Sequence, residues 1–123
     1  MRRQLSLALH QIGLDSEAVA SAREALEVLA MRRYEMVLAD VVMPDMDGYR
    51  LTRTIKRNRA LRGMPVVILT SRSSPFDLAR GALAGCNSYL VKPVSMQSLR
   101  DTVQRHLKKL AQRRRADGEY SFA

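Results

Sequence analysis

The chain has 123 residues, one cysteine, 46% hydrophobic and 27% charged residues, and a formal net charge of +9. This composition is typical of one globular domain with its own apolar core, and a single cysteine excludes an internal disulfide. No apolar run approaches the roughly 18 residues of a membrane span and no signal-peptide pattern follows the basic start, so we expect a cytoplasmic protein without membrane contact.

Hydrophobic periodicity and capping residues divide the chain into alternating helices and strands. We expect helices at 2–12, 22–32, 49–58, 75–84 and 95–112, and strands at 17–20, 36–39, 66–69 and 88–91. The strand at 17–20 is the weakest of these. This order calls for a parallel sheet that is covered by helices on both faces, which is an α/β fold.

Several helices carry start or stop signals. Ser21 precedes the second helix as an N-cap, and Ser74 followed by Pro75 begins the fourth. Gly13 and Gly85 are placed as C-caps of the first and fourth helices. On the third helix, the side chains expected to face the core are Leu51, Thr54 and Ile55.

Three of the predicted strands end at a polar residue that carries chemistry. The run Met36–Ala39 ends at Asp40, the strand at 66–69 ends at Thr70, and the strand at 88–91 ends at Lys92. The carboxyl ends of parallel strands meet at one edge of a sheet. We therefore expect a carboxylate, a hydroxyl and an ammonium to converge on one small anion-binding site.

Much of the positive charge lies between Arg100 and Arg115, at the end of the last predicted helix. Part of it favours a helix carboxyl end through the helix dipole, and the rest could attract nucleic acid, an acidic partner or a membrane surface. The basic residues Arg113, Arg114 and Arg115 are not interleaved with aromatic residues. We therefore expect a solvated helix end without specific nucleic-acid binding.

These residues resemble the motif set of the receiver domain of two-component response regulators, a CheY-like fold of flavodoxin topology. The resemblance covers about residues 1–110 and rests on the segment 38–48 (LADVVMPDMDG), on Thr70 and on Lys92 followed by Pro93. The separations of 30 residues from Asp40 to Thr70 and 52 from Asp40 to Lys92 agree with the family pattern. The implied organisation is a receiver domain at 1–112 and a basic, flexible tail at 113–123.

The resemblance implies a role for each matched residue. Asp40 would be the phosphoacceptor, with Thr70 and Lys92 as its catalytic partners. Thr70 would also act as the switch hydroxyl, and Tyr89 as the switch aromatic that rotates inward after phosphorylation. Two further positions would be structural, namely Gly48 in the turn after the acid and Pro93 with its typically cis peptide bond.

The start of the chain departs from the family pattern. Family members begin with an apolar strand that ends in two acids, and these acids help to hold Mg²⁺, whereas residues 1–3 here already look like the first helix. Of the usual Mg²⁺ ligands only Asp40 and the backbone carbonyl of Val42 remain, so Mg²⁺ binding is expected to be weakened or lost.

The missing strand would lie in the middle of the sheet, and its four or five apolar side chains would contribute about 6–15 kcal/mol. That is as large as the net stability of a typical domain. Three remedies stay open: residues upstream of Met1, exchange of elements between two chains in a homodimer, or return of the tail segment 119–123 into the vacant position.

The implied function is signal transduction in a bacterial phosphorelay. The phosphoryl donor would be a histidine kinase or a histidine phosphotransfer protein, and the output would be contact with a downstream protein. The chain would not be an enzyme beyond catalysing its own phosphorylation and dephosphorylation.

Three alternative functions are also compatible with parts of the sequence. A degenerate receiver would bind partners without being phosphorylated. A basic nucleic-acid binder would act through the arginines at 113–115. A flavodoxin-type electron carrier shares the topology, but no loop suited to a flavin phosphate is visible.

Other polar residues are expected to have no chemical role. Asp45 and Asp47 are interpreted as turn residues in the loop before the third helix. His10 and His106 are expected to be solvated on helix faces, because neither has a partner at metal-ligand spacing. Cys86 is interpreted as a small residue in a turn.

Overall fold

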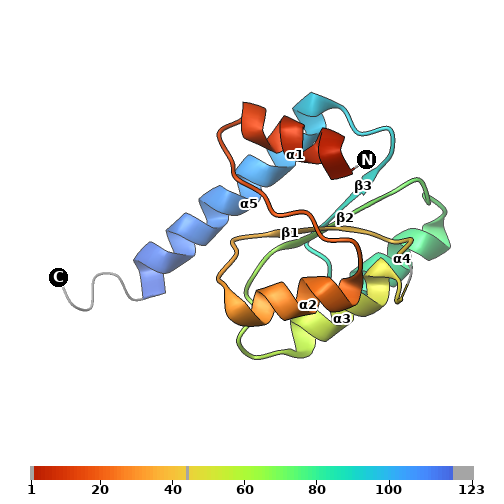
Figure 1. Cartoon of the computed structure of the whole chain (residues 1–123), viewed down its shortest axis with the longest axis horizontal. Helices are drawn as coiled ribbons and strands as arrows, with labels where there is room; N and C mark the ends of the chain where they lie inside the picture. Colours follow the sequence, from red (N-terminus) through yellow and green to blue (C-terminus); the bar gives the residue numbers. More distant parts are fainter. Residues whose placement is uncertain (1, 44, 118–123) are drawn as a thin grey trace.

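The computed structural model of the chain describes residues 2–43 and 45–117. Its elements follow one another in the order α1 (Arg2–Gln11), α2 (Ala22–Met31), β1 (Val37–Asp40), α3 (Gly48–Arg57), β2 (Val66–Thr70), α4 (Pro75–Ala84), β3 (Ser88–Val91) and α5 (Met96–Asp117). Figure 1 shows the strands at the centre, between two groups of helices. The predicted α/β architecture is therefore confirmed. Within the described residues, no helix has both the length and the apolar character that crossing a bilayer requires.

The described strands form one parallel sheet in the order β1-β2-β3. Val37 pairs with Val66 at the start of β1, and Ile68 of β2 pairs with Tyr89 of β3. All five residues of β2 are buried, as expected for a central parallel strand that is covered on both faces. This register brings the carboxyl ends of the three strands to one edge.

Helices cover the two faces of the sheet with separate apolar clusters. On one face, α2 and α3 bury Leu29, Leu51 and Ile55 against Val66, and α4 lies beside α3 (Figure 1). On the other face, α1 and α5 pack through a second set of apolar residues: Leu5, Leu9, Leu99, Val103 and Leu107. Burial of each such side chain contributes about 1.5–3 kcal/mol, so the helices and the sheet stabilise each other.

The predicted caps are confirmed by the backbone geometry. Ser21 Oγ accepts a hydrogen bond from the Glu24 N–H at 3.1 Å, and Ser74 Oγ accepts one from the Asp77 N–H at 3.1 Å. Gly85 ends α4 with φ of +96°, a left-handed conformation that glycine adopts without steric cost. Local side-chain chemistry thus sets where these helices begin and end.

The predicted strand at 17–20 is wrong. Residues 14–19 have no regular secondary structure in the chain described. A strand needs a hydrogen-bonded neighbour, and within the described residues β1 pairs on one side only, with β2. The open edge of β1 leaves Val37 and Leu38 half-buried. The three remedies proposed for this edge stay open, and the tail segment 119–123 lies outside the described residues.

Two details of the helices also differ from expectation. Thr54 is exposed, and Thr52 is the buried threonine of α3, because α3 begins at Gly48 and its buried face follows positions 48, 51, 52 and 55. Helix α5 continues to Asp117, beyond the predicted end at Gln112. No Gly or Pro lies between 112 and 117, so no local signal ends the helix earlier.

His106 was expected to be solvated, and this expectation is wrong. Its side chain lies on the buried face of α5, in register with Leu99 and Val103, and the residue is 6% exposed. The ring nitrogen Nε2 shares a hydrogen bond with Ser88 Oγ at 2.7 Å. The spacing 99–103–106 is the helical period of a buried face and could have signalled this position.

Gly48 is required by a close approach of the chain to itself. The Gly48 N–H donates to the carbonyl oxygen of Val41 at 2.9 Å, which folds the loop 41–47 back onto the end of β1. A Cβ atom at Gly48 would overlap the carbonyl oxygen of Asp40 and lie 3.0 Å from the Cα of Val41. Both neighbours are backbone atoms of the strand end and cannot move aside independently.

We therefore expect Gly48→Ala to lower the free energy of unfolding by about 1–3 kcal/mol, the usual cost of overpacking. Urea unfolding followed by circular dichroism measures this change. Gly63→Ala is the matched control, because a Cβ atom there would meet only Arg113 Nη1 at 3.8 Å. Equal losses of stability in the two variants would contradict the steric explanation.

Candidate functional site

Asp40 and Lys92 meet directly at the carboxyl edge of the sheet. Lys92 Nζ donates to Asp40 Oδ2 at 2.7 Å, and the Val42 N–H donates to Asp40 Oδ1 at 3.1 Å. The side chains of Asp40 and Lys92 are 30% and 29% exposed, so a ligand can reach the pair while much of each group is shielded from water. Partial shielding strengthens the attraction between the two charges relative to bulk water.

Thr70 lies between these two residues along the edge. It is 1% exposed, and its carbonyl oxygen accepts a hydrogen bond from the Lys92 N–H at 2.8 Å. Its hydroxyl oxygen accepts from the Arg72 N–H at 3.2 Å, which leaves the hydroxyl proton available for donation. The structure thus brings the ends of the three predicted strands together, with Asp40 and Lys92 in contact.

The residues assigned structural roles lie around this edge. The peptide bond between Lys92 and Pro93 is cis, as the resemblance implied. Val42, whose carbonyl was predicted as a metal ligand, is 69% exposed just after the strand.

Asp45 and Asp47 do more than form a turn. Asp47 is the N-cap of α3, where its Oδ1 accepts from the Arg50 N–H at 2.8 Å. Asp45 accepts from the backbone N–H groups of Ala22 and Arg23 at 3.1 and 2.8 Å, at the start of α2. These hydrogen bonds, that from Arg23 first, lower the pKa of the Asp45 carboxyl group. Asp45 therefore attaches the loop between β1 and α3 to the start of α2, which lies more than twenty residues away in the sequence.

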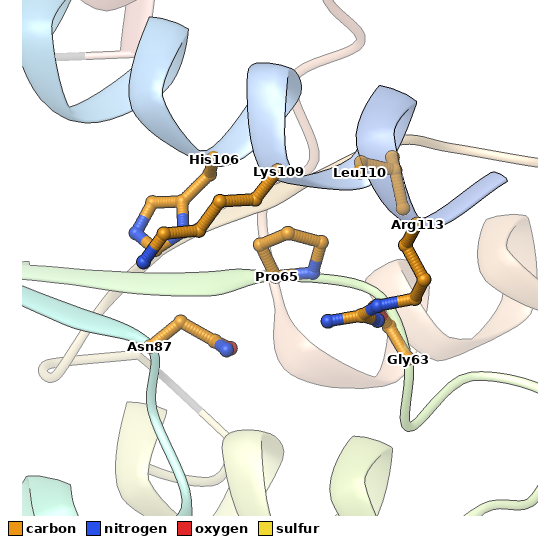
Figure 2. A pocket seen from close by; sticks show the side chains of 7 residues that line it. All are labelled: Gly63, Pro65, Asn87, His106, Lys109, Leu110 and Arg113. Atoms are coloured by element: carbon orange, nitrogen blue, oxygen red, sulfur yellow. The ribbon is translucent and has the colours of Figure 1, made fainter. Parts of the chain in front are cut away.

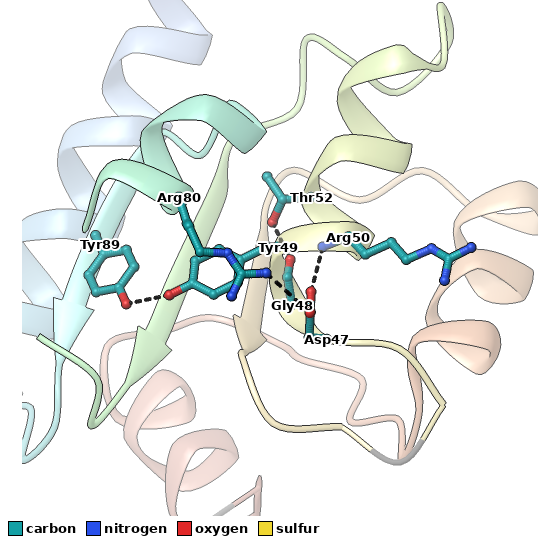
Figure 3. A network of polar contacts seen from close by, with 7 residues as sticks. All are labelled: Asp47, Gly48, Tyr49, Arg50, Thr52, Arg80 and Tyr89. Carbon is teal, nitrogen blue, oxygen red and sulfur yellow. Dashed lines mark hydrogen bonds and ion pairs between the residues drawn. The ribbon is translucent and has the colours of Figure 1, made fainter. Parts of the chain in front are cut away.

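Tyr89 belongs to a polar network that the sequence did not reveal (Figure 3). The Tyr89 hydroxyl donates to the carbonyl oxygen of Arg72 at 3.0 Å and lies 2.8 Å from the Tyr49 hydroxyl. The guanidinium of Arg80 lies 4.5 Å from the centre of the Tyr49 ring and 3.6 Å from Asp47 Oδ2. A cation over an aromatic ring is attracted by the negative charge of the ring face.

This network holds Tyr89 against α4. Gly81 leaves room for the ring, since a Cβ atom there would lie 2.8 Å from Tyr89 Cδ2. Burial, followed by the hydrogen bond with Tyr49, raises the pKa of Tyr89 above its usual value. The neutral phenol is thus the form that fits this position. Tyr49 and Arg80 were missed because no local pattern links residues 40 positions apart.

The donor set near Asp40 does not by itself fit a resident Mg²⁺ ion. No group of three or more His, Cys, Asp or Glu side chains that could hold a metal occurs within the described residues. Mg²⁺ prefers six oxygen ligands in octahedral geometry and usually one or two carboxylates. Asp40 offers one carboxylate, and both of its oxygens already accept hydrogen bonds.

Comparison with known proteins places this site in a family. The model of the response regulator receiver domain matches residues 1–104. Protein PilG of Pseudomonas aeruginosa is 32% identical over 107 residues, which are 87% of this chain and 79% of PilG. A probable cyclic di-GMP phosphodiesterase of Vibrio cholerae is 41% identical over 91 residues, 74% of this chain but only 21% of that protein.

Solved structures give the same result. The signal receiver domain of a signal transduction histidine kinase from Syntrophus aciditrophicus has a TM-score of 0.82 at 36% identity, over 87% of this chain and 81% of that chain. The chemotaxis protein CheY4 of Vibrio cholerae has a TM-score of 0.79 at 31% identity, over 85% of this chain and 87% of that chain.

The Tyr49–Tyr89 contact can be tested by substitution. We expect Tyr49→Phe to lower the pKa of Tyr89, because the variant loses the hydroxyl that favours the neutral phenol. Nuclear magnetic resonance (NMR) of ¹³C-labelled tyrosine measures this pKa. In the wild type the raised pKa stabilises the fold fully below about pH 10, and this contribution is lost as the pH rises through the folded pKa.

Tyr34→Phe is the control, because the Tyr34 hydroxyl bonds to Glu17 and lies outside this network. It should leave the pKa of Tyr89 unchanged. A Tyr89 pKa that responds equally to both substitutions would show that the contact with Tyr49 has no specific effect.

Proposed function

Because the chain belongs to the response regulator receiver domain family of two-component signal transduction, we propose that it accepts a phosphoryl group on Asp40 and then switches a protein-interaction face. The observation that carries this proposal is the contact of Lys92 Nζ with Asp40 Oδ2 at 2.7 Å. A carboxylate held beside an ammonium at the open edge of a parallel sheet suits an incoming phosphoryl group.

The chemical step would be nucleophilic attack by Asp40. One carboxylate oxygen forms a bond to phosphorus while the bond from phosphorus to the donor nitrogen of a phosphohistidine breaks, and the imidazole leaves with its electron pair. The donor would be a histidine kinase or a histidine phosphotransfer protein. Charge spreads over the phosphoryl oxygens during transfer, and Lys92 neutralises part of it.

Thr70 and Tyr89 would pass this event to the surface. The Thr70 hydroxyl retains a proton to donate, and donating it to a phosphoryl oxygen would move the side chain toward Asp40. The Arg72 N–H donates a hydrogen bond to the Thr70 hydroxyl, and the carbonyl oxygen of Arg72 accepts a hydrogen bond from the Tyr89 hydroxyl. A shift of the Arg72 backbone would therefore alter the hydrogen bonds that hold Tyr89.

The surface that would respond lies on α4 and β3. Four large apolar side chains are exposed there: Phe76 at 71%, Leu78 at 43%, Leu83 at 84% and Val91 at 39%. Together these side chains would supply the apolar part of a protein-interaction surface. Tyr89 lies within this part of the fold, so its position would control the shape of the surface that a downstream protein contacts.

We further propose that Mg²⁺ binds this chain weakly. The described residues supply one carboxylate where the family pattern has three, and the remaining ligands would have to come from water and the phosphoryl group. Lys92 would then provide most of the charge neutralisation. The chain would catalyse only its own phosphorylation and dephosphorylation.

The scarcity of metal ligands among the described residues favours a second function. With few metal ligands, the domain could act as a degenerate receiver that binds its partners without phosphorylation. The intact contact between Asp40 and Lys92 argues against this, since a binding module has no need of it.

Incubation with acetyl phosphate separates the two functions. We expect intact-mass spectrometry to show one added phosphoryl group on the wild type and none on Asp40→Asn, which lacks the nucleophile. Lys92→Gln should slow the reaction by roughly 100-fold, the usual effect of removing one group that stabilises transition-state charge.

Asp101→Asn is the matched control for Asp40→Asn, because Asp101 lies exposed on α5 and bonds only to Gln97 among the described residues. It should be phosphorylated like the wild type. Absence of added phosphoryl mass on the wild type would favour the degenerate receiver.

The dependence on Mg²⁺ tests the proposed charge neutralisation. We expect the rate of phosphorylation to change by less than about 10-fold, or 1.4 kcal/mol of barrier, when Mg²⁺ is replaced by a chelator. Rates are measured by following the phosphorylated mass over time. A much steeper dependence would show that the chain binds Mg²⁺ through further ligands.

A further inference from the structure

A small cavity of about 180 Å³ lies at the amino ends of the strands. Gly63 and Pro65 precede β2, Asn87 precedes β3, and His106, Lys109 and Arg113 reach toward them from α5 (Figure 2). Asp40 and Lys92 lie at the opposite, carboxyl ends of the strands. The cavity is therefore separate from the phosphoacceptor site.

The cavity is lined by hydrogen-bond donors on two sides. Arg113 Nη1 donates to the carbonyl oxygen of Gly63 at 3.3 Å, and the guanidinium has further N–H groups to offer. Asn87 Oδ1 accepts from the Val66 N–H at 2.9 Å, which fixes the amide and leaves its NH₂ group as a donor. Lys109 adds an ammonium. Together these groups present an amide, an ammonium and a guanidinium to one space.

The positive charge in this region has no counterpart among the described side chains. No carboxylate lines the cavity, and no ion pair joins Lys109 or Arg113 to a described Asp or Glu. Lys56 of α3 adds a further cation nearby, where its Nζ donates to the carbonyl oxygen of Met64 at 2.8 Å.

The pKa values of His106 and Lys56 are both lowered, in part by the positive charges around the cavity. Burial, and then the charges of Arg105, Lys109 and Lys56, lower the pKa of His106. Burial and the charge of Arg113 lower the pKa of Lys56. His106 also shares a hydrogen bond with Ser88 Oγ, which accepts from Arg105 Nη2 at 3.1 Å. An anion placed here would relieve this repulsion.

We propose that this cavity is a binding site for a small oxyanion of the phosphate class, independent of phosphorylation at Asp40. Its volume is below the roughly 300–1,000 Å³ of pockets that hold drug-sized ligands, so it suits one phosphate-sized group. Converging cationic and amide donors match the tetrahedral acceptor set of such an anion. An extended acidic peptide would need a longer groove than this small cavity.

The test is an NMR titration of the full chain with inorganic phosphate, against sodium chloride at equal ionic strength. We expect phosphate, and not chloride, to shift the side-chain NH₂ signal of Asn87 and to raise the pKa of His106. Lys109→Gln and Arg113→Gln should each weaken binding roughly fivefold, the effect of losing one partly solvated charge contact.

Lys108→Gln is the matched control, because Lys108 is an exposed lysine on the same helix that does not line the cavity. It should bind phosphate like the wild type. Three results would overturn the proposal: equal shifts with phosphate and chloride, equal weakening by Lys108→Gln and Lys109→Gln, or much tighter binding of a tetraglutamate peptide than of phosphate. The last result would instead identify a contact for acidic protein segments.

Discussion

The parallel pairing of β1 and β3 on either side of β2 is the constraint on which the site depends. Asp40 and Lys92 are 52 residues apart in the chain, and they meet only because the shared register ends the three strands at the same edge. The five buried residues of β2 hold this register, since a slip by one position would reverse which side chains face each layer of helices. The ion pair between Asp40 and Lys92 is thus a result of the sheet.

Loops attached to this edge do as much as the strands to shape the site. Gly48 lets the chain return to the carbonyl oxygen of Val41, and Asp45 binds the N-terminus of α2. In the loop after β2, the backbone of Arg72 donates a hydrogen bond to Thr70 and accepts one from Tyr89. The helices and strands therefore set the positions of the site residues, while these two loops connect the Asp40 edge of the sheet to α2 and to Tyr89.

The two ends of the sheet differ in the charges that they carry. At the carboxyl end a single ammonium is balanced by a carboxylate, which suits a reaction that adds and later removes a phosphoryl group. At the amino end several cations gather on α3 and α5 without a described acid beside them, which suits reversible binding of an anion. Because the two sites lie at opposite ends of the same strands, the length of the strands separates a ligand at one site from a ligand at the other.

The sequence by itself determined the features that depend on neighbouring residues. The caps at Ser21, Ser74 and Gly85 and the polar ends of the three strands follow from spacing within a few positions, and the structure confirms them. The same local reasoning failed at 17–20, where a strand-like segment has no partner to pair with.

Only the tertiary structure decided the contacts between distant elements. The hydrogen bond of Tyr49 with Tyr89, the burial of His106 and the cavity between α5 and the strands join segments that no local pattern connects. The physical reason is that caps and periodicity are set by the backbone within one or two turns, whereas hydrogen bonds and burial between elements depend on how the whole chain packs.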